Sequence, residues 1–88
     1  MITMSGNAVN SEEGILDINH DSNSADGIGI QILRKKHPVI LGQPMMFISD
    51  SNSAEIEHIL FSARYVIIKR KIKPGEIHSI MSIKLEYL

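Results

Sequence analysis

Apolar and polar residues alternate without interruption over residues 81–87, near the end of the chain. This two-residue period is typical of a strand with one buried face. Pro74 and Gly75 precede the segment and favour a turn, because proline fixes φ and glycine can adopt a positive φ. Since chain ends usually fray, we expect so apolar an end to be paired with another strand. The apolar positions are Met81, Ile83, Leu85 and Tyr87, and the polar ones are Ser82, Lys84 and Glu86.

A second clear strand is predicted for residues 27–33, where Ile28, Ile30 and Ile32 share one face. Gly29 and Gln31 are expected on the outer face, where a glycine permits the close approach of a neighbouring backbone. The Gly-x-Gly pair lacks a third glycine and a following helix, so it is a poor match to a phosphate loop. The strand interpretation is therefore preferred.

The N-terminal third is less regular. Residues 1–10 predict a short strand with Ile2, Met4 and Val9 as its apolar positions. Residues 10–27 are rich in Asn, Asp, Ser and Gly and are typical of a surface loop, within which Leu16 and Ile18 form a brief alternating pair around Asp17. The carboxylates of this loop do not follow the EF-hand spacing, which places a glutamate at the twelfth position, so calcium binding is not favoured.

Residues 34–38 predict a charged turn, and the apolar runs at 39–44 and 45–48 are short. Because proline cannot donate to a sheet ladder, Pro38 and Pro44 restrict both runs to short edge segments. Residues 52–63 carry a helical pattern, whereas residues 59–67 alternate as in a strand. We interpret residues 58–71 as one long strand that forms a hairpin with the last strand. The predicted fold class is all-β, an antiparallel sandwich of two sheets.

The chain has 88 residues, which fits a single domain, and a net charge of −1 argues against broad attraction to nucleic acid or anionic membrane. The charge is nevertheless segregated, because the first 33 residues contain no Lys or Arg. For the late basic run, a solvated strand end and loop is favoured over an anion-binding patch. That run consists of Lys69, Arg70, Lys71 and Lys73.

No catalytic or cofactor motif stands out. The chain has no cysteine, and its four histidines are not at metal-ligand spacing from one another. His58 with Glu55 or Glu57 could be drawn as an acid–base pair, but an ordinary exposed pair is favoured. No apolar run approaches the length of a membrane span, and the first residues do not resemble a secretory signal. We therefore expect a structural or interaction module without cofactors or bound metal, and not an enzyme.

Four sequence features in order resemble the C-terminal part of a type 1-like pilin, a subunit of the chaperone–usher fimbrial (pilus) family. The family patterns are a Gly-Val-Gly-Ile-Gln-like strand, a Phe-x-Ala-Arg-Tyr strand, a glycine fourteenth from the end and a penultimate tyrosine. In this chain they fall on residues 27–31, residues 61–65, Gly75 and Tyr87, and the resemblance covers residues 27–88. It also supports the strand interpretation of residues 58–71.

The resemblance implies an incomplete immunoglobulin-like sandwich that lacks its last strand. A periplasmic chaperone, and then a neighbouring pilus subunit at the usher, would supply the missing strand by donor-strand complementation, a form of β-augmentation. The expected function is that of a structural subunit of an extracellular fimbria that serves cell adhesion. The residues implied for the chaperone and donor-strand groove are Gly75, Met81, Ile83, Leu85, Tyr87 and Leu88, the last through its terminal carboxylate.

The chain departs from the family pattern in three respects. The family's signal peptide, N-terminal donor extension and disulfide between two early strands are not found in this sequence. Residues 1–88 are therefore expected to form one fimbrial-type domain truncated at its N-terminus. The alternative is a small soluble β-sandwich interaction module with no role in pili.

Overall fold

The structure is a computed structural model, and it describes residues 1–46 and 60–85. These two ranges contain eight strands and no helix, which confirms the predicted all-β class. The strands in chain order are β1 (Ile2–Gly6), β2 (Ala8–Asn10), β3 (Ile15–Leu16), β4 (Ile28–Arg34), β5 (His37–Pro38), β6 (Pro44–Met45), β7 (Ser62–Ile67) and β8 (Met81–Leu85).

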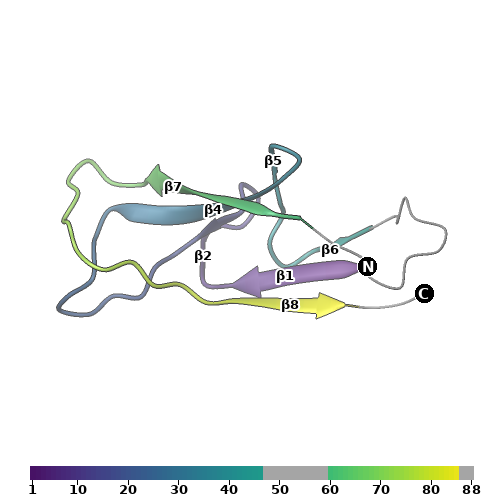
Figure 1. The fold of residues 1–88 in the computed structure, drawn as a ribbon, viewed down its shortest axis with the longest axis horizontal. Coiled ribbons are helices and arrows are strands. Elements are labelled where there is room, and N and C mark those ends of the chain that lie inside the picture. The colour runs from purple at the N-terminus through teal and green to yellow at the C-terminus, as the bar shows by residue number, and fades with distance from the viewer. Residues whose placement is uncertain (47–59, 86–88) are drawn as a thin grey trace.

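The strands form two antiparallel sheets (Figure 1). The smaller sheet has the order β6-β1-β8. The larger sheet has the order β2-β3-β4-β5, and β7 pairs with the other edge of β4. The buried core is shared, since it contains Ile2 and Met4 from β1 together with Leu16 from β3 and Ile32 from β4. The two sheets therefore pack face to face, as the sequence predicts, and the arrangement is compatible with an incomplete β-sandwich.

Strand β4 is the central strand of the larger sheet and is buried on both faces. Ile32 on its inner face and Gln31 on its outer face are 7% and 4% exposed. The amide of buried Gln31 donates from Nε2 to the carbonyl of Glu13 at 2.8 Å, and its Oε1 accepts from Nε of Arg64 at 2.7 Å. The predicted close approach of a neighbouring backbone at Gly29 is confirmed, because a Cβ there would lie 3.0 Å from the carbonyl oxygen of Leu16.

One part of the early sequence is more buried than predicted. Residues 10–27 were expected to be a surface loop, but Leu16 and Ile18 are 2% and 3% exposed, and Leu16 belongs to β3. A pair of apolar residues is too short to distinguish a strand from a loop by period alone. The segments at the prolines are short, as predicted, since β5 and β6 contain two residues each. β5 nevertheless lies within the predicted turn, and residues 39–43 of the predicted edge segment form no strand.

The predicted hairpin between residues 58–71 and the last strand is wrong. β7 covers only Ser62–Ile67 and pairs with β4, whereas β8 pairs with β1 in the other sheet. Residues 58–59 lie outside the described part of the chain, and Ile68 and Lys69 leave the strand, because both N–H groups turn to the carbonyl of Gly27. Residues 68–80 thus cross from one sheet to the other instead of turning back (Figure 1).

Gly75 lies in this crossing segment, and its role differs from the predicted turn. Neither a turn nor a positive φ is found at residue 75. A Cβ at Gly75 would instead lie 2.6 Å from the backbone of Asn23, Ser24 and Ala25. Glycine is therefore required here because two backbone segments touch, and this contact joins the crossing segment to the loop before β4. Among the residues described, no helix is long and apolar enough to cross a membrane.

Candidate functional site

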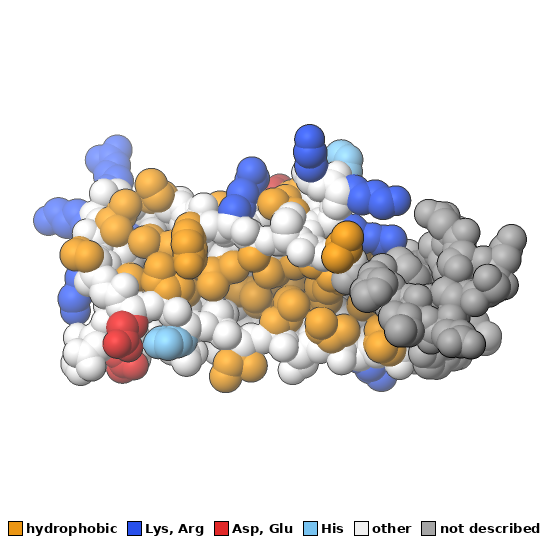
Figure 2. Space-filling view, in the orientation of Figure 1, with side chains coloured by type: hydrophobic (Ala, Val, Ile, Leu, Met, Phe, Trp, Pro, Cys, Tyr) orange, Lys and Arg blue, Asp and Glu red, His pale blue; other side chains and the backbone are white. Residues whose placement is uncertain are grey.

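The last two described strands are both edge strands. Within residues 1–46 and 60–85, β7 pairs only with β4 and β8 pairs only with β1. In Figure 1, β7 runs along one long side of the molecule and β8 along the other. Figure 2 shows a continuous band of hydrophobic side chains over the middle of the same face. We call this face the open side, and define it by the side chains of Tyr65, Ile67, Ile83 and Leu85.

Strand pairing shows that the apolar side chains of β8 point toward the core. Ile83 is opposite Met4 and Leu85 is opposite Ile2, and residues opposite each other in an antiparallel pair share a face. Met4 and Ile2 are 0% and 3% exposed. Ile83 and Leu85 are nevertheless 54% and 56% exposed. These two side chains therefore face the interior without being covered by the described residues.

The same situation holds for β7. Tyr65 is opposite Ile30 and Ile67 is opposite Ile28, so both side chains lie on the face of β4 that packs against the core. Tyr65 and Ile67 are 69% and 72% exposed. Ordinary sandwich strands bury their inward side chains between the sheets. Four inward-facing apolar side chains on two edge strands thus mark an unfinished side of the sandwich.

The structure brings only some of the predicted groove residues together. Met81, Ile83 and Leu85 lie on β8 with their side chains on one face, as predicted, and Met81 packs partly against the core. Gly75 is not part of this face, because it packs on residues 23–25. Tyr87 and Leu88 lie outside the described residues.

Tyr65 and Ile67 were missed as site residues. Their alternation is visible in the sequence, but the predicted hairpin places the last strand beside them. These side chains are exposed because β7 pairs with β4 alone among the described strands. An alternating pattern predicts which side chains share a face of a strand, but it does not predict which strand lies next to it.

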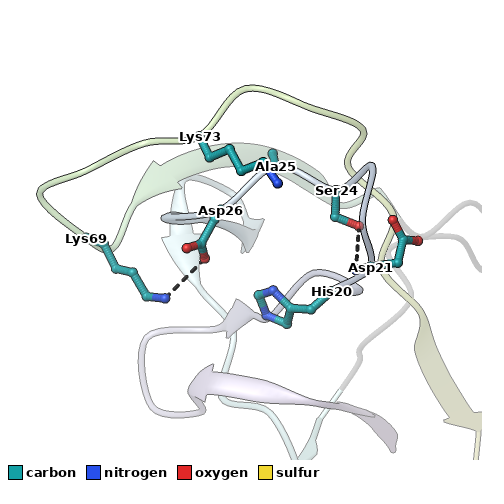
Figure 3. A pocket seen from close by; sticks show the side chains of 7 residues that line it. All are labelled: His20, Asp21, Ser24, Ala25, Asp26, Lys69 and Lys73. Carbon is teal, nitrogen blue, oxygen red and sulfur yellow. Dashed lines mark hydrogen bonds and ion pairs between the residues drawn. The ribbon is translucent and has the colours of Figure 1, made fainter.

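A second feature is a depression at the end of the molecule where the crossing segment meets the loop before β4 (Figure 3). Nζ of Lys69 and Oδ1 of Asp26 are 3.1 Å apart, and both side chains are substantially exposed. The hydrogen bond from Lys69 and the backbone N–H of Gly27 lower the pKa of Asp26 below its ordinary value of 3.8. The lining residues are His20, Asp21, Ser24, Ala25, Asp26, Lys69 and Lys73.

Asp21 has a structural role in the loop beside this depression. Its Oδ1 accepts the backbone N–H of Asn23 at 2.8 Å, and its own N–H donates to Oγ of Ser24 at 3.1 Å. The N–H of Asn23, followed by the hydroxyl of Ser24, lowers the pKa of Asp21 below 3.8. These local bonds fix the loop that carries His20 and Asp26.

Side chains suited to metal or acid–base chemistry are scattered over the described chain. Nε2 of His20 lies 3.0 Å from Asp17, and Nε2 of His78 lies 3.4 Å from Glu76, in two exposed pairs. No cluster of three His, Cys, Asp or Glu residues that could hold a metal ion occurs within residues 1–46 and 60–85. The predicted pair of His58 with Glu55 or Glu57 lies outside the described residues.

Neither a search of protein-family models nor a search of curated proteins finds a match to this chain.

Proposed function

We propose that this chain is a structural subunit that accepts a β-strand from a partner protein on its open side. The observation that carries the proposal is the exposure of Tyr65, Ile67, Ile83 and Leu85, whose strands place them toward the core. An incoming strand would pair its backbone with an edge that has no partner strand among residues 1–46 and 60–85, and bury its own apolar side chains between the sheets. Unpaired edges of this kind otherwise favour aggregation.

The apolar surface is large enough to contribute substantially to such an assembly. Completely burying a large apolar side chain stabilises by about 1.5–3 kcal/mol relative to full exposure. The four side chains of the open side are between 54% and 72% exposed, so covering them would contribute roughly 4–7 kcal/mol. Loss of translational and conformational freedom in the incoming strand offsets part of this gain.

The biological setting that we propose is a bacterial fimbria of the chaperone–usher type. In that setting a periplasmic chaperone and then a neighbouring subunit would provide the strand, the usher would accommodate the exchange, and the extracellular fibre would serve adhesion. The pattern of residues 27–31 and 61–65 supports this assignment, together with the position of β8 at a sheet edge. In the alternative, the open side belongs to an interaction module unrelated to pili.

A strand peptide tests the proposal. A synthetic peptide with alternating apolar and polar residues is titrated into the full chain, and thermal unfolding is followed by circular dichroism. A peptide that binds only the folded state raises the melting temperature progressively with its concentration. The matched control is a peptide of the same composition whose apolar residues are clustered instead of alternating. Equal effects of the two peptides, or no effect of either, would contradict strand acceptance.

A fimbrial chaperone distinguishes the two settings. In the pilus setting Tyr87→Ala abolishes capture of the chain by the chaperone, whereas the alternative predicts only a modest loss of stability. Binding is measured by co-purification from a periplasmic co-expression strain. Peptide binding without chaperone binding would retain strand acceptance and reject the fimbrial assignment.

A further inference from the structure

The segment that crosses from β7 to β8 carries an unusual density of positive charge. Four of the five residues from 69 to 73 are Lys or Arg, and all four are exposed. Figure 2 shows Lys and Arg side chains projecting from the end of the molecule where this segment turns in Figure 1. We call this set the basic end, and it consists of Lys69, Arg70, Lys71 and Lys73.

The backbone of the basic end is held by the loop before β4. Asp26 and Lys73 exchange two backbone hydrogen bonds of 3.0 and 3.1 Å, and the N–H of Ile68 donates to the carbonyl of Gly27 at 2.8 Å. Gly27 has a φ of 83°, and a Cβ there would lie 2.6 Å from the carbonyl oxygen of Lys71. The charged side chains therefore project from a positioned backbone, which reduces the ordering required when a ligand binds.

The depression beside the basic end combines cations with hydrogen-bond acceptors. Figure 3 shows Lys69 and Lys73 on the crossing segment, opposite His20 and Asp26 on the loop. The ion pair between Lys69 and Asp26 is exposed, and pairs of this kind contribute little stability. Both partners can therefore exchange their mutual contact for contacts with a ligand.

The mixture of charges distinguishes between classes of ligand. Three carboxylates at this end, Asp21, Asp26 and Glu76, offset three of the four cations. Such a surface attracts an extended phosphate backbone or an anionic membrane only weakly at long range. Residues 19–27 and 68–76 also contain no Phe, Tyr or Trp side chain on which a nucleic-acid base could stack.

We propose that this depression binds an acidic carbohydrate. Its carboxylate or sulfate groups are held by the ammonium groups of Lys69 and Lys73, and its hydroxyl groups donate hydrogen bonds to the carboxylate of Asp26. A ligand with both anionic and hydroxyl groups satisfies the cations and the carboxylate together, which a simple polyanion does not. From sequence alone the basic run reads as a solvated loop, and the fixed backbone and the adjoining depression are what support a binding site.

The test uses the full chain labelled with ¹⁵N and monitors amide shifts on titration with defined oligosaccharides. A heparin-derived oligosaccharide provides sulfate and carboxylate, and an oligogalacturonate provides carboxylate alone. We expect saturable shifts centred on residues 20–26 and 68–73 with at least one of them, and the stronger ligand identifies the anionic group. The double variant Lys69→Gln, Lys73→Gln is expected to weaken this binding by at least about fivefold, since each exposed charge contact contributes modestly.

The matched control is Lys35→Gln, Lys36→Gln, which removes the same charge from the turn between β4 and β5. The site requires this control to bind like the unmodified chain, and equal weakening in both double variants would overturn the proposal. Equal binding of a neutral cello-oligosaccharide, tighter binding of single-stranded oligodeoxythymidylate, or no binding of either acidic oligosaccharide would also overturn it. Lys73→Gln alone leaves the ion pair between Lys69 and Asp26 intact. Weaker binding by this variant, with an unchanged fold, shows loss of the site and not loss of folding. None of the four open-side side chains takes part, so the result is independent of strand acceptance.

Discussion

Lys35 and Lys36 adopt φ values of 50° and 68° in the two-residue turn that joins β4 to β5. Turns of this kind usually contain Asn-Gly, because positive φ brings Cβ close to the following carbonyl oxygen, a penalty that glycine avoids and asparagine tolerates. We expect Lys35→Asn, Lys36→Gly to raise the free energy of unfolding by about 1 kcal/mol. Urea denaturation followed by circular dichroism measures the change, and the Lys35→Gln, Lys36→Gln variant controls for loss of charge. A midpoint equal to that of the control would contradict the strain argument.

The lowered pKa of Asp26 should depend on the side chain of Lys69. Lys69 is the largest cause of the lowered pKa of Asp26, whereas the N–H of Asn23 is the largest cause for Asp21. Lys69→Gln should therefore move the pKa of Asp26 back toward its ordinary value and leave that of Asp21 in place. Carboxyl ¹³C titration by NMR follows both groups in one sample. Equal movement of both carboxyl groups would show that the shift comes from net charge and not from the ion pair.

The sign of the corresponding stability effect follows from the direction of the shift. A carboxyl whose folded-state pKa lies below its unfolded value stabilises the folded state at every pH above the unfolded pKa. For Asp26 this contribution is present above pH 3.8 and is lost as the pH falls through the lower, folded-state value. Protonation weakens the attachment of the crossing segment, because the ion pair with Lys69 is lost.

Among the elements, β8 has a side chain that distinguishes packing from binding. Ile83 is 54% exposed in the free chain, so Ile83→Lys should lower its stability by less than about 1 kcal/mol. The same substitution places an ammonium group where the proposed incoming strand would pack, and it should abolish the expected rise in melting temperature with the alternating peptide. Ile80→Lys is the matched control, because Ile80 is 75% exposed and precedes β8. Equal loss of the peptide effect in both variants would place the binding elsewhere.

The sequence predicts which face of each strand is buried better than it predicts which strands pair with each other. The two-residue period correctly assigned β4 and β8 and the inward faces of Ile32 and Ile83. It did not assign the neighbour of β8, since an alternating strand fits equally well beside β1 or β7. Adjacency along the chain and Pro74-Gly75 favoured a hairpin. Gly75 instead packs on the backbone of residues 23–25, in the segment that crosses between the sheets. No local sequence pattern predicts this contact, because its two sides are far apart in the chain.

The candidate site was predictable to the same extent. The alternation near the chain end predicts the part of the open side that β8 contributes. Met81, Ile83 and Leu85 are the residues that it places there. The β7 side depends on which strand borders Tyr65 and Ile67, and that is a property of the whole topology. The depression depends equally on long-range pairing, because the bridge between Asp26 and Lys73 joins segments that the sequence separates widely.

At the scale of the whole molecule, the chain is more extended than a compact domain of its length. Its radius of gyration is 15.1 Å and its extents are 49 × 22 × 21 Å. A compact domain of 88 residues has a radius of gyration of about 12 Å. An elongated sandwich with an open side buries less apolar surface per residue, so its stability should depend strongly on whatever completes it.

Hydrogen exchange tests this view across all the strands at once. In the free chain, amides of β4 should exchange most slowly, because β4 is paired along both edges, and those of β7 and β8 should exchange faster. A bound strand that completes the sandwich adds hydrogen bonds along one open edge. Amide protection on that edge strand should therefore rise more than the protection of β4 does. The distant edges formed by β2 and β5 serve as the internal control. An equal rise in every strand would mean that the peptide stabilises the fold without pairing with its edge.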